Sequence, residues 1–314
     1  MFGKKVVADM ISRSAENEHD RRSFLRAAGV AGLGTVGAVA LSGAGTESAF
    51  ADETSDSTDR AVLNFALNLE YLEAQFYSYA YWGEGLDSGD LTGSGTQGKV
   101  TGGRKVKFKT KAIKEYAREI AMDERNHVKF LRSALDGKQV SQPAIDLKTS
   151  FTAAARAAGL IKNNQTFDPF ANENNFLLGA FIFEDVGVTA YKGAAPLITN
   201  KTYLEAAAGI LAVEAYHAGI VRSALYRKGL FTEVRKISNV RDAVDGSSDD
   251  DQSIKSGSHA NIVPTDSNSI AYSRSAANVL NVVYLTPAQT SKGGFFPAGV
   301  NGPIRTSNNN NGAS

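Results

Sequence analysis

Two short motifs in the chain combine a carboxylate with an imidazole at the same spacing. Glu124 and His127 form one Glu-x-x-His motif, and Glu214 and His217 form the other. Residues three apart lie on one face of an α-helix, so each motif presents its two side chains together. Oxygen and nitrogen donors of this kind suit a divalent metal ion.

Both motifs fall on apolar stripes of long amphipathic segments. The apolar residues that share a face with the first motif are Ile113, Ala117, Ile120, Val128, Leu131 and Leu135, and those that share a face with the second are Ala207, Ile210, Leu211, Ala218, Val221 and Leu225. Both pairs therefore point toward a core, where an unpartnered carboxylate is costly. A single pair at this spacing is common on helix surfaces, but two pairs on apolar stripes favour metal binding over surface ion pairs.

Four long helices are predicted to position these residues. Their ranges are 58–82, 110–135, 172–197 and 199–228, and a short helix is expected at 150–158. The segment from 136 to 170 is long for a turn between antiparallel neighbours, so it is expected to cross the bundle from end to end. The glycine-rich segment 83–103 reads as a loop.

The two halves of this region repeat one another. When Glu70 in the first helix is aligned with Glu184 in the third, Tyr77 falls on Tyr191. Each half thus has a helix with a Glu and then a helix with Glu-x-x-His. The repeat favours Glu70 as the functional acid of the first helix, while Glu73, one turn away, remains an alternative or a supporting group.

Composition excludes several classes of site. The chain has 314 residues, a 42% hydrophobic content, no cysteine and a net charge of +1. This content supports a sizeable core, and the near-neutral charge gives no basis for nucleic-acid binding. Without cysteine there is no disulfide, thiolate metal site or cysteine nucleophile.

The first 51 residues are predicted to be an export signal. Arg21 and Arg22, followed by Phe24 and Leu25, resemble the twin-arginine box, and a Gly/Ala-rich, weakly apolar run extends from about 27 to 44. A small-x-small cleavage site at 49–51 would start the mature chain near Asp52. The run is short and glycine-rich for a membrane span, so we expect export to the periplasm, cell wall or medium without a stable membrane anchor. Twin-arginine export machinery carries folded proteins, often with a cofactor inserted.

Two Glu-bearing helices and two Glu-x-x-His helices resemble the plan of ferritin-like dimetal carboxylate proteins. Residues 69–77, 284–287 and 293–302 are similar to segments of the exported, desiccation-related type of that family. This resemblance implies an all-α, ferritin-like four-helix bundle with a long crossover connection. Carried over residue by residue, it implies a centre of two bridged iron or manganese ions held by Glu70, Glu124, His127, Glu184, Glu214 and His217. Tyr77 and Tyr191 would hydrogen-bond a ligand from another helix or carry an oxidising equivalent, unless they only pack.

The resulting hypothesis divides the chain into a signal (1–51), a bundle (52–230) and a loop-rich C-terminal extension (231–314). Its function would be that of an exported oxidoreductase acting on peroxide, oxygen or Fe²⁺, in stress or desiccation protection. A homo-oligomer is compatible with the sequence. The alternative is a non-catalytic, secreted protective or surface-binding scaffold.

Several other polar residues are predicted to lie outside the set of metal ligands. Glu119, Asp123 and Asp185 are expected to face solvent or to support the site, and His259 is expected not to bind metal. The acidic segment 239–269 reads as an exposed, solvated loop. The aromatic residues Phe295 and Phe296 are expected to pack on the bundle.

Overall fold

The computed structural model describes residues 47–247 and 250–311. Residues Ser55–Ser314 form one compact unit, and Met1–Thr54 are grouped apart from it. The predicted export signal lies outside the described residues, except that residues 47–51 belong to the first described helix.

The four long helices predicted from the sequence are confirmed. They are α3 (Glu47–Tyr81), α4 (Lys111–Leu135), α6 (Glu173–Ala194) and α7 (Lys201–Arg227). The first of them starts earlier than the expected residue 58. The shorter elements are η1 (Ser88–Asp90), β1 (Val100–Thr101), β2 (Ile145–Asp146), α5 (Thr149–Ala157), η2 (Ala195–Leu197), α8 (Phe231–Asp245), β3 (Lys255–Ser256), β4 (His259–Ala260) and α9 (Ala276–Tyr284).

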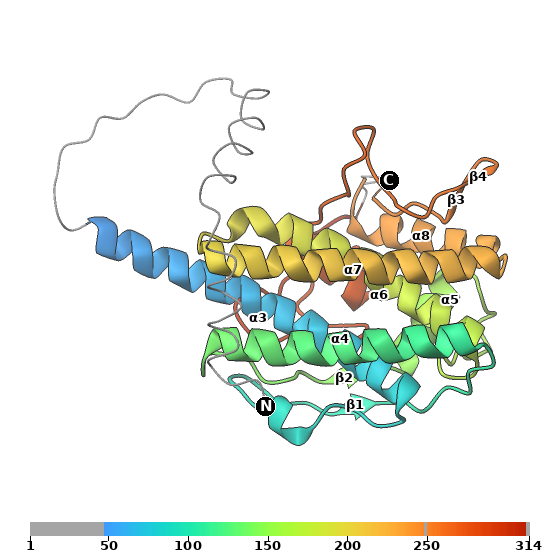
Figure 1. Ribbon diagram of the computed structural model, residues 1–314, viewed down its shortest axis with the longest axis horizontal. Coiled ribbons are helices and arrows are strands. Elements are labelled where there is room, and N and C mark those ends of the chain that lie inside the picture. Colours follow the sequence, from blue (N-terminus) through green and yellow to red (C-terminus); the bar gives the residue numbers. More distant parts are fainter. Residues whose placement is uncertain (1–46, 248–249, 312–314) are drawn as a thin grey trace. The chain divides into compact units, whose positions relative to one another are not determined.

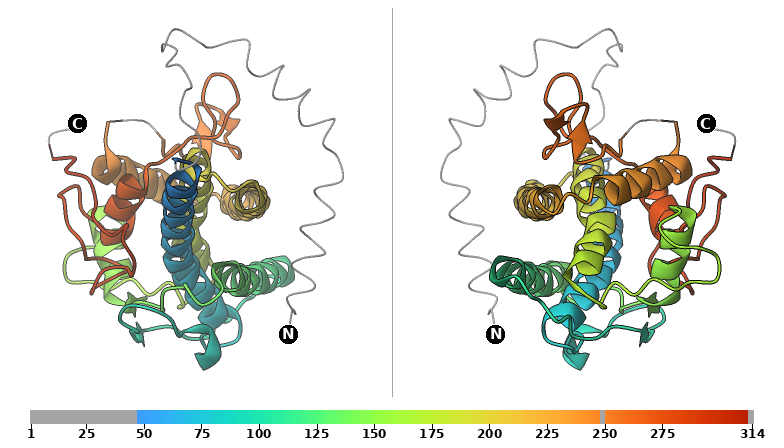
Figure 2. Two further views of the ribbon diagram at one scale, coloured as in Figure 1. Left: turned by 90° about the vertical axis from the view of Figure 1, so that its left-hand side faces the viewer. Right: turned by 90° about the vertical axis from the view of Figure 1, so that its right-hand side faces the viewer.

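The four long helices form the bundle, with α4 and α7 on the same side of α3 and α6 (Figures 1 and 2). The segment that joins α4 to α6 runs back along the bundle and carries β2 and α5 (Figure 1). On the way, β2 pairs in parallel with β1. Because this segment returns to the starting end, α4 and α6 run in the same direction, which is the crossover that the length of the segment predicted.

Side-chain caps fix where α6 and α7 begin. The Asn172 side chain accepts hydrogen bonds from the backbone N–H groups of Asn174 and Asn175, and Asn200 does the same at the start of α7. Such caps satisfy N–H groups that have no partner within the helix. The buried Asp59 of α3 accepts from the backbone of Thr199 and Asn200, so it ties the start of α7 to the first bundle helix.

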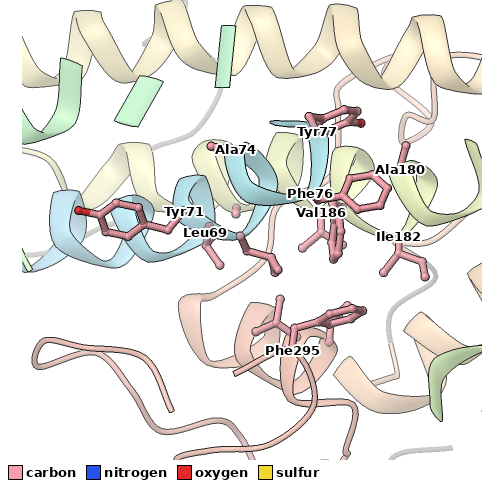
Figure 3. Packing of buried hydrophobic residues seen from close by; sticks show 14 of the residues in the cluster. Leu69, Tyr71, Ala74, Phe76, Tyr77, Ala180, Ile182, Val186 and Phe295 are labelled. Carbon is pink, nitrogen blue, oxygen red and sulfur yellow. The ribbon is translucent and has the colours of Figure 1, made fainter. Parts of the chain in front are cut away.

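Aromatic rings fill the core on the side of the bundle away from α4 and α7. The Phe76 ring of α3 lies 5.5 Å from the rings of Phe151 and Phe183. Phe295, from the C-terminal segment, packs edge-on against the same two rings at 4.9 and 5.0 Å. Figure 3 shows Phe295 facing the α3 and α6 side chains across this layer. The C-terminal segment therefore contributes to the hydrophobic core.

The prediction of an exposed loop over residues 239–269 was wrong in part. Its beginning belongs to α8, and Arg241 and Asp245 are buried. Asp251, from the acidic run, is only 3% exposed because it forms ion pairs with Arg241 and Arg274. These arginines neutralise the buried carboxylates. Arg241 lies within the segment and Arg274 follows it, but a count of polar residues does not show which charges pair after folding.

Among the described helices, α7 is the one whose length and composition would permit it to cross a membrane. Its Glu214 and His217 are buried toward the other bundle helices. Its opposite face carries Ala208, Ala212, Ala215 and Tyr216, which are exposed.

Candidate metal centre

Four helices bring the six predicted ligands to one place. Glu70 comes from α3, Glu184 from α6, and one Glu-x-x-His pair comes from each of α4 and α7. All six side chains belong to buried residues. Donor atoms of Glu70, Glu124, His127 and Glu214 lie within 4.8 Å of one another, as do those of Glu184, Glu214 and His217. Glu214 belongs to both groups, so the two groups form a single cluster.

His127 faces three carboxylates through one ring nitrogen. Its Nδ1 lies 3.2 Å from Glu70 Oε2, 3.4 Å from Glu124 Oε2 and 3.6 Å from Glu214 Oε1. The three oxygens come from three different helices. This nitrogen is thus the point at which the first half of the cluster converges.

His217 has a corresponding position in the second half. Its Nδ1 lies 3.0 Å from Glu124 Oε1 and 3.6 Å from Glu184 Oε2. The other ring nitrogen, Nε2, lies 3.1 Å from Asp123 Oδ2. A carboxylate that accepts a hydrogen bond from Nε2 leaves the Nδ1 lone pair directed into the cluster. Because Glu124 contacts both imidazoles, it lies between the two halves.

Two tyrosine hydroxyls form hydrogen bonds between α3 and α6 within the cluster. The Tyr77 hydroxyl of α3 donates to Glu184 of α6, and the Tyr191 hydroxyl of α6 donates to Glu70 of α3. Of the roles predicted for them, hydrogen bonding to an acidic residue on another helix is therefore present. Each hydroxyl holds one carboxylate oxygen and fixes its orientation.

The two sequence repeats differ one helical turn after their aligned acids, Glu70 in α3 and Glu184 in α6. Glu73 follows Glu70, is buried, and interacts electrostatically with Glu70, Glu124 and Glu184. At the equivalent position in α6 stands Gly187, where a Cβ would collide with the carboxylate of Glu214. Gly187 was not predicted as part of the site, although a glycine three residues after Glu184 inside a helix was the available signal.

Burial makes ionisation of these carboxyls difficult. It raises the pKa of Glu70 to about 7 and that of Glu184 to about 8, and it holds the pKa of Glu73 and Glu214 well above the ordinary value. Glu124 differs, because His127 and His217 lower its pKa despite the same burial.

The pKa values of the two imidazoles, His127 and His217, are also raised. Burial disfavours their charged form, but Glu70 and Glu124 raise the pKa of His127 to about 11. Hydrogen bonds to Asp123 and Glu124 raise the pKa of His217 to about 10. The cluster therefore holds protons on its imidazoles and on several carboxyls, and these are the positions that a cation would take over.

Unsatisfied atoms in the cluster fit a metal ion. Among the described residues, both carboxylate oxygens of Glu124 and of Glu214, one of Glu184, and Nδ1 of His217 are buried without a hydrogen bond of acceptable geometry. Buried polar atoms are normally paired. Carboxylate oxygens with imidazole nitrogens match the donor preference of iron and manganese, so the residues present fit such ions.

The remaining polar groups separate into three environments. Glu119 is exposed and Asp123 supports His217, as expected. Asp185, expected to face solvent or to support the site, is instead buried and accepts from Arg222 and Arg241. His259 lies exposed in β4.

Comparison with known proteins agrees with this geometry. The sequence profile described as the ferritin-like domain matches residues 58–227, which contain all six residues of the cluster. The chain belongs to the ferritin-like domain family. The resemblance inferred from its motifs is thereby confirmed.

The chain is similar in sequence to two curated relatives. The chain is 32% identical to the desiccation-related protein PCC13-62 of Craterostigma plantagineum over 172 residues, which is 54% of each protein, so it spans about half the length of that relative. It is 26% identical to the ferritin-like catalase Nec2 of Nesocodon mauritianus over 270 residues, covering 79% of this chain and 85% of the relative. No solved structure matches the chain significantly.

Proposed function

We propose that this ferritin-like chain holds two iron or manganese ions and decomposes peroxide. The observation that carries the proposal is the convergence of two Glu-x-x-His pairs, Glu70 and Glu184, with several buried oxygen and nitrogen atoms that form no hydrogen bond of acceptable geometry with the described residues. The ions, when bound, would supply the two-electron redox chemistry by which one peroxide is oxidised to O₂ and another reduced to water. The relative named as a ferritin-like catalase supports this choice of substrate.

The protein side chains would hold and orient the reacting groups. Asp123 accepts from His217 Nε2 and so keeps Nδ1 directed into the cluster. Tyr77 and Tyr191 restrain Glu184 and Glu70. Glu73 lies beside the proposed ligands without belonging to either donor group, so it is placed to exchange protons with a bound peroxide.

Oxygen evolution from hydrogen peroxide tests the proposal. Protein reconstituted with manganese or with iron is expected to release one O₂ for every two peroxides consumed. Glu124→Gln and Glu214→Gln are expected to abolish this activity, while Glu119→Gln, a change on the exposed face of α4, leaves it unchanged. Wild-type protein that holds metal but evolves no O₂ and instead oxidises Fe²⁺ would show a ferroxidase.

A second candidate function follows from the relative with the higher identity, a protein named for desiccation. In that case the bundle would be a protective scaffold without catalysis. Survival of drying by cells that produce Glu124→Gln separates the two: unchanged protection favours the scaffold.

We also propose that the chain is exported by the twin-arginine route, on the basis of Arg21, Arg22 and the following apolar run. Replacement of both arginines by lysine is expected to retain the protein in the cytoplasm. Export that is unaffected by this change would contradict the route.

A further inference from the structure

A groove lies between α4 and α7, on the outer side of the metal cluster. Its volume is about 990 Å³, and its lining includes His217 and Asp123. The two helices that form it lie on one side of the bundle, as both views show (Figures 1 and 2). This volume lies within the range of sites that bind organic ligands and far exceeds the needs of peroxide.

The groove lining includes several apolar side chains. Ile113 and Tyr116 of α4 line it, as do Ile220 of α7 and Val263 of the segment after β4. Val263 is 71% exposed, as is Tyr216, which also lines the groove. Two of the large apolar side chains that the described part of the chain leaves exposed thus gather here. Exposed apolar side chains that gather in a hollow indicate a binding surface.

The two ends of the groove carry opposite charge. Arg227 and Lys228 line one end, and Asp123 and Glu119 lie toward the other. His217 and Lys228 are eleven residues apart on the same helical run, which corresponds to roughly 17 Å along the axis. An elongated ligand with an anionic head could therefore lie in only one orientation.

The basic end is reinforced by neighbouring charges. Lys111 and Lys114, in the first turn of α4, are exposed and adjoin Thr110 and Ala112 of the groove lining. Lys228 already pairs with Glu173 at 2.7 Å. Arg227 is exposed, and no described acidic side chain forms an ion pair with it. Its guanidinium is thus available to a carboxylate.

We propose that the groove binds a single-chain amphiphile with a carboxylate head, of the medium-chain fatty-acid class. The carboxylate contacts Arg227, the chain lies on Ile113, Tyr116 and Ile220, and its far end approaches His217. The apolar lining and the cationic Arg227 at one end together select this class, while Asp123 and Glu119 repel an anionic head from the other end. The inference does not depend on the proposed peroxide chemistry, because binding is measured without turnover.

Two glycines of α7 provide a matched pair of variants. A Cβ at either Gly209 or Gly219 meets no atom within 4 Å, so both positions accept a side chain. Gly219 lines the groove and Gly209 does not. Gly219→Trp is expected to fill the groove and to weaken laurate binding at least tenfold, whereas Gly209→Trp changes it less than twofold.

Titration calorimetry with laurate, decanoate, octanoate and dodecanol tests the proposal on metal-free and metal-loaded protein. Affinity is expected to rise about fourfold per methylene up to laurate. Arg227→Gln is expected to weaken laurate about tenfold and to leave dodecanol unchanged, and this variant serves as the test if Gly219→Trp fails to fold.

Three results would overturn the proposal. One is the absence of the expected pattern, shown by affinity that does not change with chain length and falls equally in both tryptophan variants. Another is binding to vesicles of anionic phospholipid without binding to soluble laurate, which would assign the groove to a membrane surface. The third is a dimer that Gly219→Trp converts to a monomer, which would make a second copy of the chain the occupant.

Discussion

At the scale of single residues, the site depends on groups that orient the proposed ligands. His217 contacts Asp123 through Nε2, and each tyrosine donates to a glutamate of another helix. Partners of this kind fix the ring tautomer and the direction of the lone pairs. Loss of such a partner is expected to alter metal affinity without altering the fold.

Asp123→Asn removes the carboxylate that accepts from His217 Nε2. We expect metal affinity to fall by about 10- to 100-fold. Competition with a chelator measures the change. Glu119→Gln, on the exposed face of the same helix, is the control, and equal affinities for the two variants would contradict a role for Asp123.

Tyr77→Phe removes the hydroxyl that donates to Glu184 and leaves a buried carboxylate oxygen unpaired. We expect the free energy of unfolding of the metal-free protein to fall by about 1–3 kcal/mol. Urea denaturation measures it, with Tyr216→Phe as the exposed control. An unchanged stability would show that the hydrogen bond is not formed in solution.

At the scale of elements, a buried ionic network joins α8 and the C-terminal segment to the bundle. Arg274 lies 2.5 Å from Asp245 of α8, pairs with Asp251, and donates to Thr189 of α6 at 2.7 Å. Arg241 of α8 and Arg222 of α7 both contact Asp185 of α6. Buried charges of this kind are tolerated only with their partners.

Arg274→Met is therefore expected to destabilise the protein by about 3–5 kcal/mol, because it takes the ion-pair partner from the buried carboxylate of Asp245 and one of two partners from Asp251. Urea denaturation of the whole chain measures the loss. Arg305→Met changes an exposed arginine and should fall within about 0.5 kcal/mol of wild type. Similar effects of the two substitutions would contradict the network.

A comparison of α4 with the buried ionic network shows which features could be predicted from the sequence and which could not. The α4 stripe predicted both the helix and the inward direction of Glu124 and His127, because the information is periodic and local. The burial of Asp251 depends on Arg274, which is distant along the chain and comes close only after folding. Gly187 was missed for a similar reason, since its role is defined by the Glu214 side chain of another helix.

At the scale of the whole molecule, a bound metal ion would compete with protons for the cluster. Glu70 and Glu184 have raised pKa values in the folded protein, about 7 and 8, and those of His127 and His217 are about 11 and 10. Each group binds its proton more tightly when folded than when unfolded. Their contribution to stability is complete below the unfolded pKa and is lost as pH rises through the folded one.

The melting temperature of the metal-free protein is accordingly expected to fall as the pH rises from about 5 to about 10. Divalent metal should remove or reverse this slope, because ligands that have lost their protons bind it more tightly. Thermal unfolding with and without manganese measures both effects. Identical pH profiles in the two conditions would mean that the cluster does not bind the ion.

The most direct test of the account is a metal count combined with anomalous scattering on crystals of protein reconstituted at neutral pH. We expect two iron or manganese ions per chain, located between Glu70, Glu124, Glu184 and Glu214 and lost from the Glu124→Gln, Glu214→Gln double variant. Fewer than one ion per chain, or ions bound away from these residues, would contradict it.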